Sequence, residues 1–355
     1  MISNNLYPIK FDPIYKTKMW GGSRISQLPN RSGVPRSCGE SWDISGVEGC
    51  ESVIANGFLA GNSLSEAIEV YMGDLVGESV YDRFGLDFPL LVKIIDAQDN
   101  LSVQVHPGDD MALEKHQSYG KTEMWYVIDA QPSSYLYAGF KDSIGKEEYA
   151  RRVADGTICD VLARHEVQSG DVFYIPAGRI HAIGKGILLA EVQQSSDVTY
   201  RIYDYNRLGL DGKPRELHTE LAVDAIDFSV EDDYLTHYRS SINHPERVID
   251  SPFFKVKMLQ VNRSFHRRMY KYDTFIIYTC INGECRIVLR DTNYSVVLKS
   301  GNSCLIPASV ADYDVVPIGE SPRLLEIYID NRRSKFRKML SKVRFVRKFF
   351  RVTKR

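Results

Sequence analysis

Residues 170–177 read GDVFYIPA and residues 301–308 read GNSCLIPA. Both segments start with a glycine and, after four further residues, end in Ile-Pro-Ala. Strand-forming residues precede each copy, so each copy reads as a strand followed by a turn. The repeat predicts two related β-barrels, unless two strand-turn segments resemble each other by chance. The position five residues past the proline is His181 in the first copy and Asp312 in the second.

The remaining pattern is typical of a mainly β protein with a few inserted helices. Helical signals are few: a capping box at Ser63–Glu66 before an amphipathic stretch, a helix from about residue 216, and shorter helices at 110–116 and 146–153. Short β-branched or aromatic runs bounded by turn residues predict strands, as in a β-sandwich or barrel. These runs are residues 90–95, 124–128, 172–175, 187–192, 274–280, 285–289 and 324–329.

Composition bounds the class of protein. The chain has 355 residues, 43% hydrophobic and 26% charged, which is typical of a globular protein. It has no apolar run of about 18 residues and no secretory signal pattern at its start. Six scattered cysteines without a CxxC pair favour free thiols in a reducing compartment, so we expect a cytoplasmic protein.

The net charge of −1 conceals an asymmetry. Residues 331–355 hold 12 of the 45 basic residues and no acidic one, so the other 330 residues hold 33 basic and 46 acidic side chains. An acidic body argues against nucleic-acid binding. Apolar residues at 336, 340, 343, 346 and 350 lie near helical spacing among the basic residues, which predicts weak contact of this tail with an anionic membrane surface. The alternative is a solvated extension that packs on the acidic body.

One constellation of residues suggests chemistry. In LSVQVHP (residues 101–107), Ser102, Gln104 and His106 project to one face of a strand, because side chains alternate with period two. Glu123 follows within KTEMWY (121–126), and His181 follows PAGRI (176–180). Two imidazoles and a carboxylate with an open position are what catalytic Zn²⁺ uses, and Gln104 could add a carbonyl oxygen. Taken one by one, these histidines could equally be hydrogen-bonded structural residues.

Several segments resemble one enzyme family. QVHP (104–107), KTE (121–123) and PAGRIHAI (176–183) resemble the metal-binding strands of the type I mannose-6-phosphate isomerases of the cupin superfamily, closest to the shorter bacterial branch. WGG (20–22), GESWDIS (39–45), EVQQSSDVTYR (191–201) and LHTELA (217–222) also resemble family segments, in family order up to about residue 228. The second barrel resembles the family only in outline, and the tail does not resemble it. One departure is KTE where much of the family reads KPE.

The resemblance implies a fold and a site. It implies two cupin-type (jelly-roll) barrels and one Zn²⁺ per chain, bound by His106, Glu123 and His181 in the first barrel. Gln104 is a possible fourth ligand, and Arg201 corresponds to the catalytic arginine. The second barrel would lack metal ligands. The domains expected are residues 1–245 (metal-binding, with helical inserts), 246–330 (cupin-like) and 331–355 (basic tail).

The implied reaction interconverts D-mannose 6-phosphate and D-fructose 6-phosphate. A proton would move between C1 and C2 through a cis-enediol, with the metal and Arg201 stabilising the developing negative charge. Lys121 is the first candidate for the general base and Glu40 the second, although Lys121 could instead form a salt bridge. For the phosphate, Lys121 and Arg201 are candidates, and Arg179 and Lys185 are weaker ones. Arg201 could instead pair with Asp197 or Asp204, which are close in sequence.

Two other classes of function remain open. One is another metal-dependent cupin enzyme, acting on a different sugar phosphate or as an oxygenase, since iron oxygenases also use two histidines and a carboxylate. The GESWDIS and SSDVTYR segments argue against the oxygenase. The other is a non-enzymatic module that binds sugar phosphate. The sequence leaves the oligomeric state open.

Overall fold

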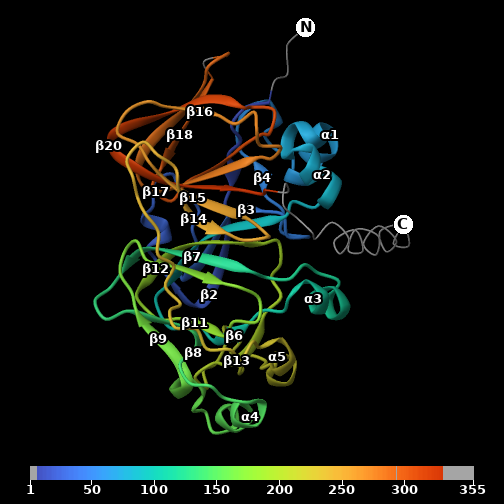
Figure 1. Cartoon of the computed structure of the whole chain (residues 1–355), viewed down its shortest axis with the longest axis vertical. Coiled ribbons are helices and arrows are strands. Elements are labelled where there is room, and N and C mark those ends of the chain that lie inside the picture. Colours follow the sequence, from blue (N-terminus) through green and yellow to red (C-terminus); the bar gives the residue numbers. More distant parts are fainter. Residues whose placement is uncertain (1–5, 293, 331–355) are drawn as a thin grey trace.

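The computed structural model describes residues 6–292 and 294–330 and shows two β units, one above the other (Figure 1). The chain is mainly β, as predicted. All pairings between the named strands are antiparallel. The tail at 331–355, and with it the predicted amphipathic segment, lies outside the described residues.

Two sheets form the first unit. The first sheet contains β2 (Ile14–Gly22), β3 (Cys38–Ser45), β5 (Leu90–Ala97), β7 (Glu123–Ala130), β10 (Val172–Ile175) and β12 (Ile187–Gln194), in the order β10-β7-β12-β5-β2-β3. The second sheet contains β6 (Val103–Val105), β8 (Tyr135–Phe140), β9 (Leu162–Glu166), β11 (His181–Ile183) and β13 (Tyr200–Tyr203), in the order β13-β6-β11-β8-β9.

The second unit is one continuous sheet. It contains β14 (Glu246–Asp250), β15 (Lys255–Gln260), β16 (Phe265–Arg268), β17 (Ile276–Leu289), β18 (Ser295–Lys299), β19 (Ser303–Ile306) and β20 (Asp312–Tyr328). Its main path is β14-β15-β20-β17-β18, with β16 paired to β20 and β19 to β17. The prediction of separate strands at 274–280 and 285–289 is wrong. They are one strand, β17, because bulges around Asn282 bend the chain without breaking its pairing to β20.

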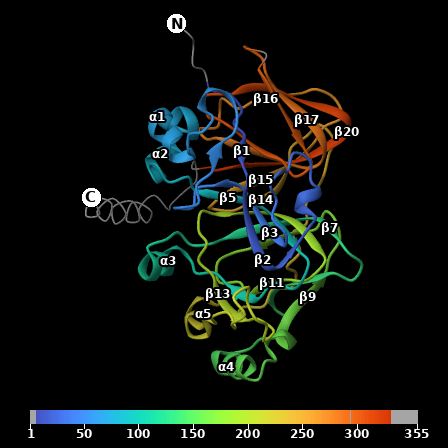
Figure 2. The same ribbon diagram turned by 180° about the vertical axis from the view of Figure 1, so that it is seen from behind.

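Helices lie at the margins of both units (Figures 1 and 2). The predicted capping box is confirmed at the start of α1: Ser63 Oγ accepts from the Glu66 amide, and Glu66 accepts from the Ser63 amide. The helices are α1 (Leu64–Val76) and α2 (Glu78–Phe84) beside the second unit, and α3 (Asp109–His116), α4 (Lys146–Ala154) and α5 (Thr219–Ala225) beside the first. Short 3-10 turns occur at Ile25–Gln27, Gly57–Leu59 and Ile158–Val161, and a two-stranded sheet pairs β1 (Phe11–Asp12) with β4 (Val53–Ile54).

The two units repeat the same strand register. In the first, Glu191 of β12 lies opposite Trp125 of β7 and Lys93 of β5. In the second, Glu326 of β20 lies opposite Tyr278 of β17 and Lys257 of β15. The order β10-β7-β12-β5 therefore corresponds to β19-β17-β20-β15, and the turn hydrogen bond from residue 179 to Pro176 recurs from Val310 to Pro307. This register supports the duplication inferred from the repeated Ile-Pro-Ala.

The interiors of the units differ. In the first unit the His181 ring packs edge-on against Trp125. In the second unit Tyr278 occupies the register position of Trp125, and the ring that packs edge-on against it is Tyr313, with the two centroids 6.1 Å apart. Tyr313 lies one residue beyond Asp312, which the repeat aligned with His181. Asp312 is partly exposed at the unit's edge, where it pairs with His266.

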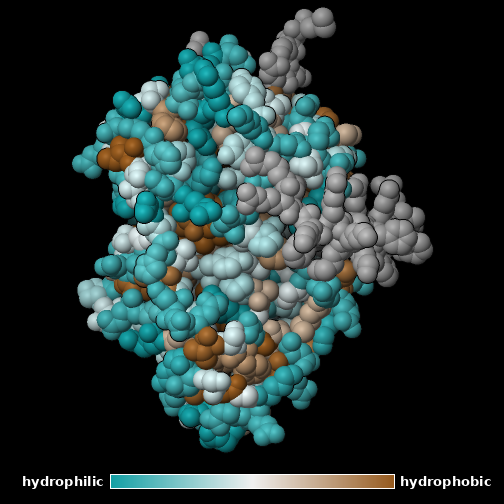
Figure 3. All heavy atoms as spheres, viewed as in Figure 1, coloured by the Kyte–Doolittle hydropathy of each residue, from teal (hydrophilic) through white to brown (hydrophobic). Residues whose placement is uncertain are grey.

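The cores run across the predicted domain boundary. The largest hydrophobic cluster joins residues before position 245, such as Ile44 and Val92, to residues of the second unit, such as Val256 and Leu325. A core that is shared in this way does not locate the boundary, so the domain boundary at residue 245 stays a prediction. On the face drawn in Figure 3, hydrophilic residues cover most of the surface. No helix within the described residues is long and apolar enough to cross a membrane.

The ion pair of Arg267 with Glu326 can be tested for its contribution to the stability of the second unit. Its guanidinium lies 2.6 Å from the fully buried carboxylate of Glu326, which also accepts a hydrogen bond from Tyr278. Arg267→Met should lower the free energy of unfolding by about 3 kcal/mol, because it leaves most of a buried negative charge unpaired. Urea unfolding would measure this, with Arg268→Met at the neighbouring exposed position expected to change stability by less than about 0.5 kcal/mol. Equal effects of the two variants would contradict the prediction.

Candidate metal centre and active site

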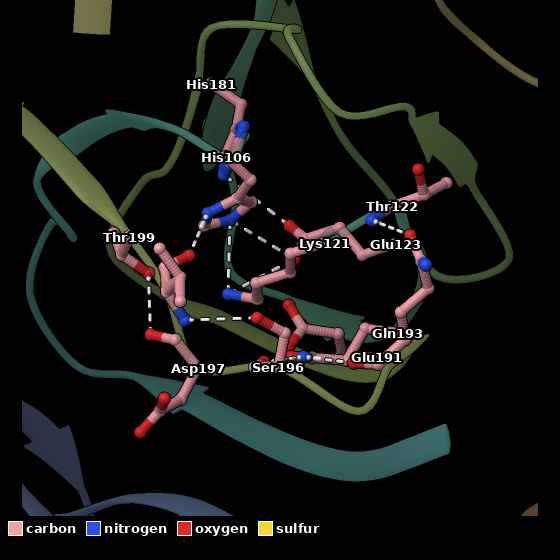
Figure 4. A network of polar contacts seen from close by, with 12 residues as sticks. His106, Lys121, Thr122, Glu123, His181, Glu191, Gln193, Ser196, Asp197 and Thr199 are labelled. Atoms are coloured by element: carbon pink, nitrogen blue, oxygen red, sulfur yellow. Dashed lines mark hydrogen bonds and ion pairs between the residues drawn. The ribbon is translucent and has the colours of Figure 1, made fainter. Parts of the chain in front are cut away.

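Three potential metal ligands converge inside the first unit. His106 follows β6, Glu123 begins β7 and His181 begins β11, so each lies at a strand end where a side chain turns inward. One ligand atom from each lies within 4.8 Å of the others, and the three residues are at most 1% exposed. Figure 4 shows the two imidazoles and the carboxylate turned toward one another. Among the described residues this is the one such cluster found.

The backbone fixes the imidazoles in one tautomer. Nδ1 of His106 lies 3.1 Å from the Val198 carbonyl, and Nδ1 of His181 lies 2.8 Å from the Arg179 carbonyl. Because a carbonyl oxygen only accepts, both Nδ1 atoms carry the proton, and each Nε2 atom keeps a lone pair that can bind a metal. Burial, followed by the charge of Lys121, lowers the pKa of His106 to about 3, which keeps the ring neutral.

Two buried atoms at the centre have no hydrogen-bond partner, and a bound cation would satisfy both. His181 Nε2 and Glu123 Oε2 are buried without a hydrogen-bond partner, which is costly unless something else satisfies them. Burial opposes ionisation of Glu123, but the positive charge of Lys121 favours it, and the pKa of the carboxyl lies well below its usual range. Two neutral nitrogens and one carboxylate oxygen suit a divalent transition metal such as zinc.

A pocket of about 290 Å³ lies beside this centre. Lys121 reaches both, since its Nζ lies 3.1 Å from His106 Nε2 and 3.5 Å from Glu123 Oε2 while the residue also lines the pocket. The salt bridge considered for Lys121 is therefore present. Ser102 and Gln104 line the pocket as the strand alternation predicts, and Gln104 lies opposite both His181 and Arg201 in the strand register.

Two buried carboxylates form the pocket wall, and each is held by a lysine and an indole. Glu191 lies 2.9 Å from Lys93 Nζ and accepts from the Trp125 indole at 2.9 Å. Glu40 lies 3.1 Å from Lys18 Nζ and accepts from the Trp42 indole at 2.7 Å. The sequence analysis identifies Glu40 as a site residue but does not identify Glu191, Lys93 or Lys18. The signal for Lys93 was available: it is a lone charge in the otherwise apolar run LLVKII (90–95).

Arg201 lines the pocket and has no carboxylate partner among the described residues. Its Nη1 donates to the Glu216 carbonyl at 2.9 Å, and its Nε is buried without a partner. Neither ion pair considered for Arg201, with Asp197 or with Asp204, is present among the described residues, and Asp204 instead binds Arg207 and Arg215.

The weaker phosphate candidates are not brought to the pocket. Arg179 pairs with Glu231 and stacks over the Tyr234 ring, and Lys185 is exposed on a turn. Neither lines the pocket. Three cations that do line it, Lys18, Lys93 and Arg215, were missed by sequence reasoning.

The fold and the site together define a cupin-type protein with a candidate metal centre beside a polar, cation-rich pocket. Comparison with known families agrees. Residues 9–136 match the catalytic domain of phosphomannose isomerase type I, and residues 244–320 match the mannose-6-phosphate isomerase cupin domain.

Similar proteins extend the match to most of the chain. Mannose-6-phosphate isomerase ManA of Bacillus subtilis (strain 168) is 35% identical over 309 residues, which are 86% of this chain and 95% of the relative. Mannose-6-phosphate isomerase of Streptococcus mutans is 35% identical over 297 residues, 83% of this chain and 91% of the relative. The chain belongs to the type I mannose-6-phosphate isomerase family.

Solved structures share the architecture. The crystal structure of the mannose 6-phosphate isomerase from Bacillus subtilis superposes with a TM-score of 0.80 at 31% identity, covering 91% of this chain and all of that one. A putative mannosephosphate isomerase from Archaeoglobus fulgidus has a TM-score of 0.73 at 22% identity, covering 92% of this chain and all of that one, and supports the fold alone.

Lys93 should be essential to the stability of the pocket wall. Burial opposes its charged form, but Glu191 and then Glu40 outweigh burial and raise the pKa of Lys93. Lys93→Met would leave the buried Glu191 carboxylate without a cation and should cost about 3–5 kcal/mol in the free energy of unfolding.

The matched control is Lys18→Met. The Lys18 side chain is 35% exposed, against 6% for Lys93, so loss of its pair with Glu40 should cost at most about 1 kcal/mol. Urea unfolding of both variants checks the difference. A cost below about 1 kcal/mol for Lys93→Met would show that Glu191 does not depend on it.

Proposed function

We propose that the chain catalyses the reversible isomerisation of D-mannose 6-phosphate and D-fructose 6-phosphate. The observation that carries the proposal is the buried set of His106, Glu123 and His181 next to a pocket lined by five lysine and arginine side chains. Such a pocket suits a phosphorylated sugar, and the relatives' names give mannose 6-phosphate as that sugar.

The proposed cofactor is one Zn²⁺ per chain, bound by His106, Glu123 and His181. The fixed tautomers and the orphaned Nε2 and Oε2 atoms support a metal, and Gln104 remains a proposed fourth ligand. When bound, zinc would act as a Lewis acid that stabilises negative charge on the C1 and C2 oxygens.

The proposed chemistry is proton transfer between C1 and C2 through a cis-enediol. We assign the transfer to Lys121 rather than Glu40. Burial would raise the pKa of Glu40, but Lys93 and Lys18 outweigh it and lower the pKa to about 2, which leaves the carboxylate a weak base. Lys121 lies at the boundary between the triad and the pocket, which supports its role.

Arg201 is the second proposed catalytic residue. Its guanidinium has no carboxylate partner among the described residues, so its charge remains available to an anionic group of the substrate. Its amide donates to His218 Nδ1 and its Nη1 to the Glu216 carbonyl, and these contacts support a fixed orientation.

His181→Ala tests the proposal. Isomerase activity, measured with mannose 6-phosphate and coupled detection of fructose 6-phosphate, should fall to background while the circular dichroism spectrum stays native. Metal analysis of the same samples should show about one zinc per chain in the unchanged protein and a loss in the variant. Full activity after removal of metal by a chelator would refute the proposal. Activity on a different sugar phosphate, or oxygen consumption, would favour another cupin enzyme instead.

We also propose a cytoplasmic location and weak contact of residues 331–355 with anionic membranes. Twelve basic residues and no acidic one favour an anionic surface.

Flotation with phosphatidylserine-containing vesicles checks the tail. The full chain should float at low salt and a chain ending at Asn331 should not, because the cationic residues have been removed. The attraction should weaken with added salt. Identical flotation of both chains would exclude the tail as the contact.

A further inference from the structure

The segment that carries Lys121 and leads to Glu123 is held largely by side chains. β7 begins only at Glu123, and the three residues before it lie outside the strand and are buried. Their amides need partners, because a buried N–H without one is costly. The Lys121 amide donates to the Pro107 carbonyl at 3.1 Å. The amides on either side of it, those of Gly120 and Thr122, donate to side chains instead.

Asp109 and Gln194 supply these two acceptors. Asp109 Oδ1 accepts from the Gly120 amide at 2.8 Å, and Gln194 Oε1 accepts from the Thr122 amide at 2.9 Å. The side-chain nitrogen of Gln194 also donates to Asp109 Oδ1 at 2.9 Å, so the two side chains are joined. Both residues are buried. Together they form one connected network that holds the backbone on both sides of Lys121.

The same network reaches the segments that carry the two histidines. Asp109 lies three residues after His106, at the first position of α3. Thr122 Oγ1 accepts from the Ala177 amide at 3.2 Å, in the turn that leads to His181. The next amide of that turn donates to the His106 carbonyl at 2.9 Å. All three candidate metal ligands therefore lie on segments that these hydrogen bonds connect.

Gly120 shows how closely two of these segments approach each other. A Cβ atom at this position would lie 2.6 Å from the Asp109 amide nitrogen and 2.8 Å from Asp109 Oδ1. Both distances are below the 3.0 Å that Cβ atoms keep from other heavy atoms. The shorter one is to backbone, so rotation of a side chain could not relieve it. Glycine is needed here because the backbone must come within hydrogen-bond distance of Asp109.

We propose that Asp109 and Gln194 are positioning residues, which hold Lys121 and Glu123 in the geometry that metal binding and proton transfer require. The inference rests on the proposed function for the roles of the metal and of Lys121. Neither Asp109 nor Gln194 lines the pocket, so we assign neither of them a contact with substrate. Groups that orient metal ligands from outside typically account for about 10- to 100-fold in metal affinity or activity.

The test compares Asp109→Ala with Asp110→Ala in the full chain. Asp110 is the matched control, because it is also an acidic residue in the first turn of α3 but is exposed. The first readout is the dissociation constant of zinc, measured by competition with a chromophoric chelator. The second is kcat and KM for mannose 6-phosphate with zinc bound. Urea unfolding checks that each variant is folded under the conditions of the assay.

Asp109→Ala should weaken zinc binding by about 10- to 100-fold and lower kcat by a similar factor. The KM should change by less than about 3-fold, because the residues that line the pocket are unchanged. Asp109→Asn should recover most of both losses, since it keeps an oxygen that can accept from Gly120 and Gln194. Asp110→Ala should change all of these constants by less than about 3-fold.

Gln194→Met gives the same comparison if Asp109→Ala does not fold, because methionine keeps the length of the side chain and removes both polar atoms. Zinc affinity and kcat within about 3-fold of the unchanged protein in a folded variant would overturn the proposal, since the network would then only stabilise the loop. Equal losses in Asp109→Asn and Asp109→Ala would also overturn it. Because zinc binding needs no turnover, a loss of zinc affinity that asparagine restores would support the proposal even if the chain did not isomerise mannose 6-phosphate.

Discussion

The carboxylate of Glu123 lies almost wholly out of water, and the first β unit is arranged around it. An ionised carboxylate in such a place costs several kcal/mol unless opposite charges and hydrogen-bond donors compensate. Within the protein the segment before β7 supplies the positive charge through Lys121, while β6 leads to His106 and β11 begins at His181, whose unprotonated nitrogens also face the carboxylate. Both histidines are fixed by backbone carbonyls with their free nitrogens facing inward. A metal ion completes this arrangement, since it would satisfy the atoms that the protein alone leaves unpaired.

The second β unit meets the same constraint in a different way. Glu326 occupies the register position of Glu191, with a lysine and an aromatic residue opposite it in both units. In the second unit Arg267 reaches across the interior to Glu326, so a guanidinium provides the charge balance there. The position matching Glu123 is Ile276, because both lie opposite the isoleucine that precedes the repeated proline. The lysine, glutamate and aromatic set thus belongs to the duplicated fold, and the three candidate ligands belong to the first unit.

The sequence predicted the site better where neighbours along the chain determine the geometry. Strand alternation correctly grouped Ser102 and Gln104 on the pocket side, and the capping box correctly located the start of α1. The sequence analysis failed where contacts between distant segments determine which charged residues pair. Asp204 was expected to compete for Arg201, but it pairs with Arg207 and Arg215 from the loop that follows. Arg179 is two residues from His181 and yet pairs away from the pocket, because it lies before the start of β11 and its guanidinium pairs with Glu231.

The sequence alone determined the residue types, their alternation along each strand, the repeated turn and the order of the family motifs. These features are local, because they depend on a period of two residues or on hydrogen bonds within one turn. Only the tertiary structure decided which charges meet: Lys93 with Glu191, Arg267 with Glu326, and Arg215 beside Arg201. It also placed Tyr313 rather than Asp312 against Tyr278. Strand register and loop path set these contacts, and both follow from packing between segments far apart in the chain.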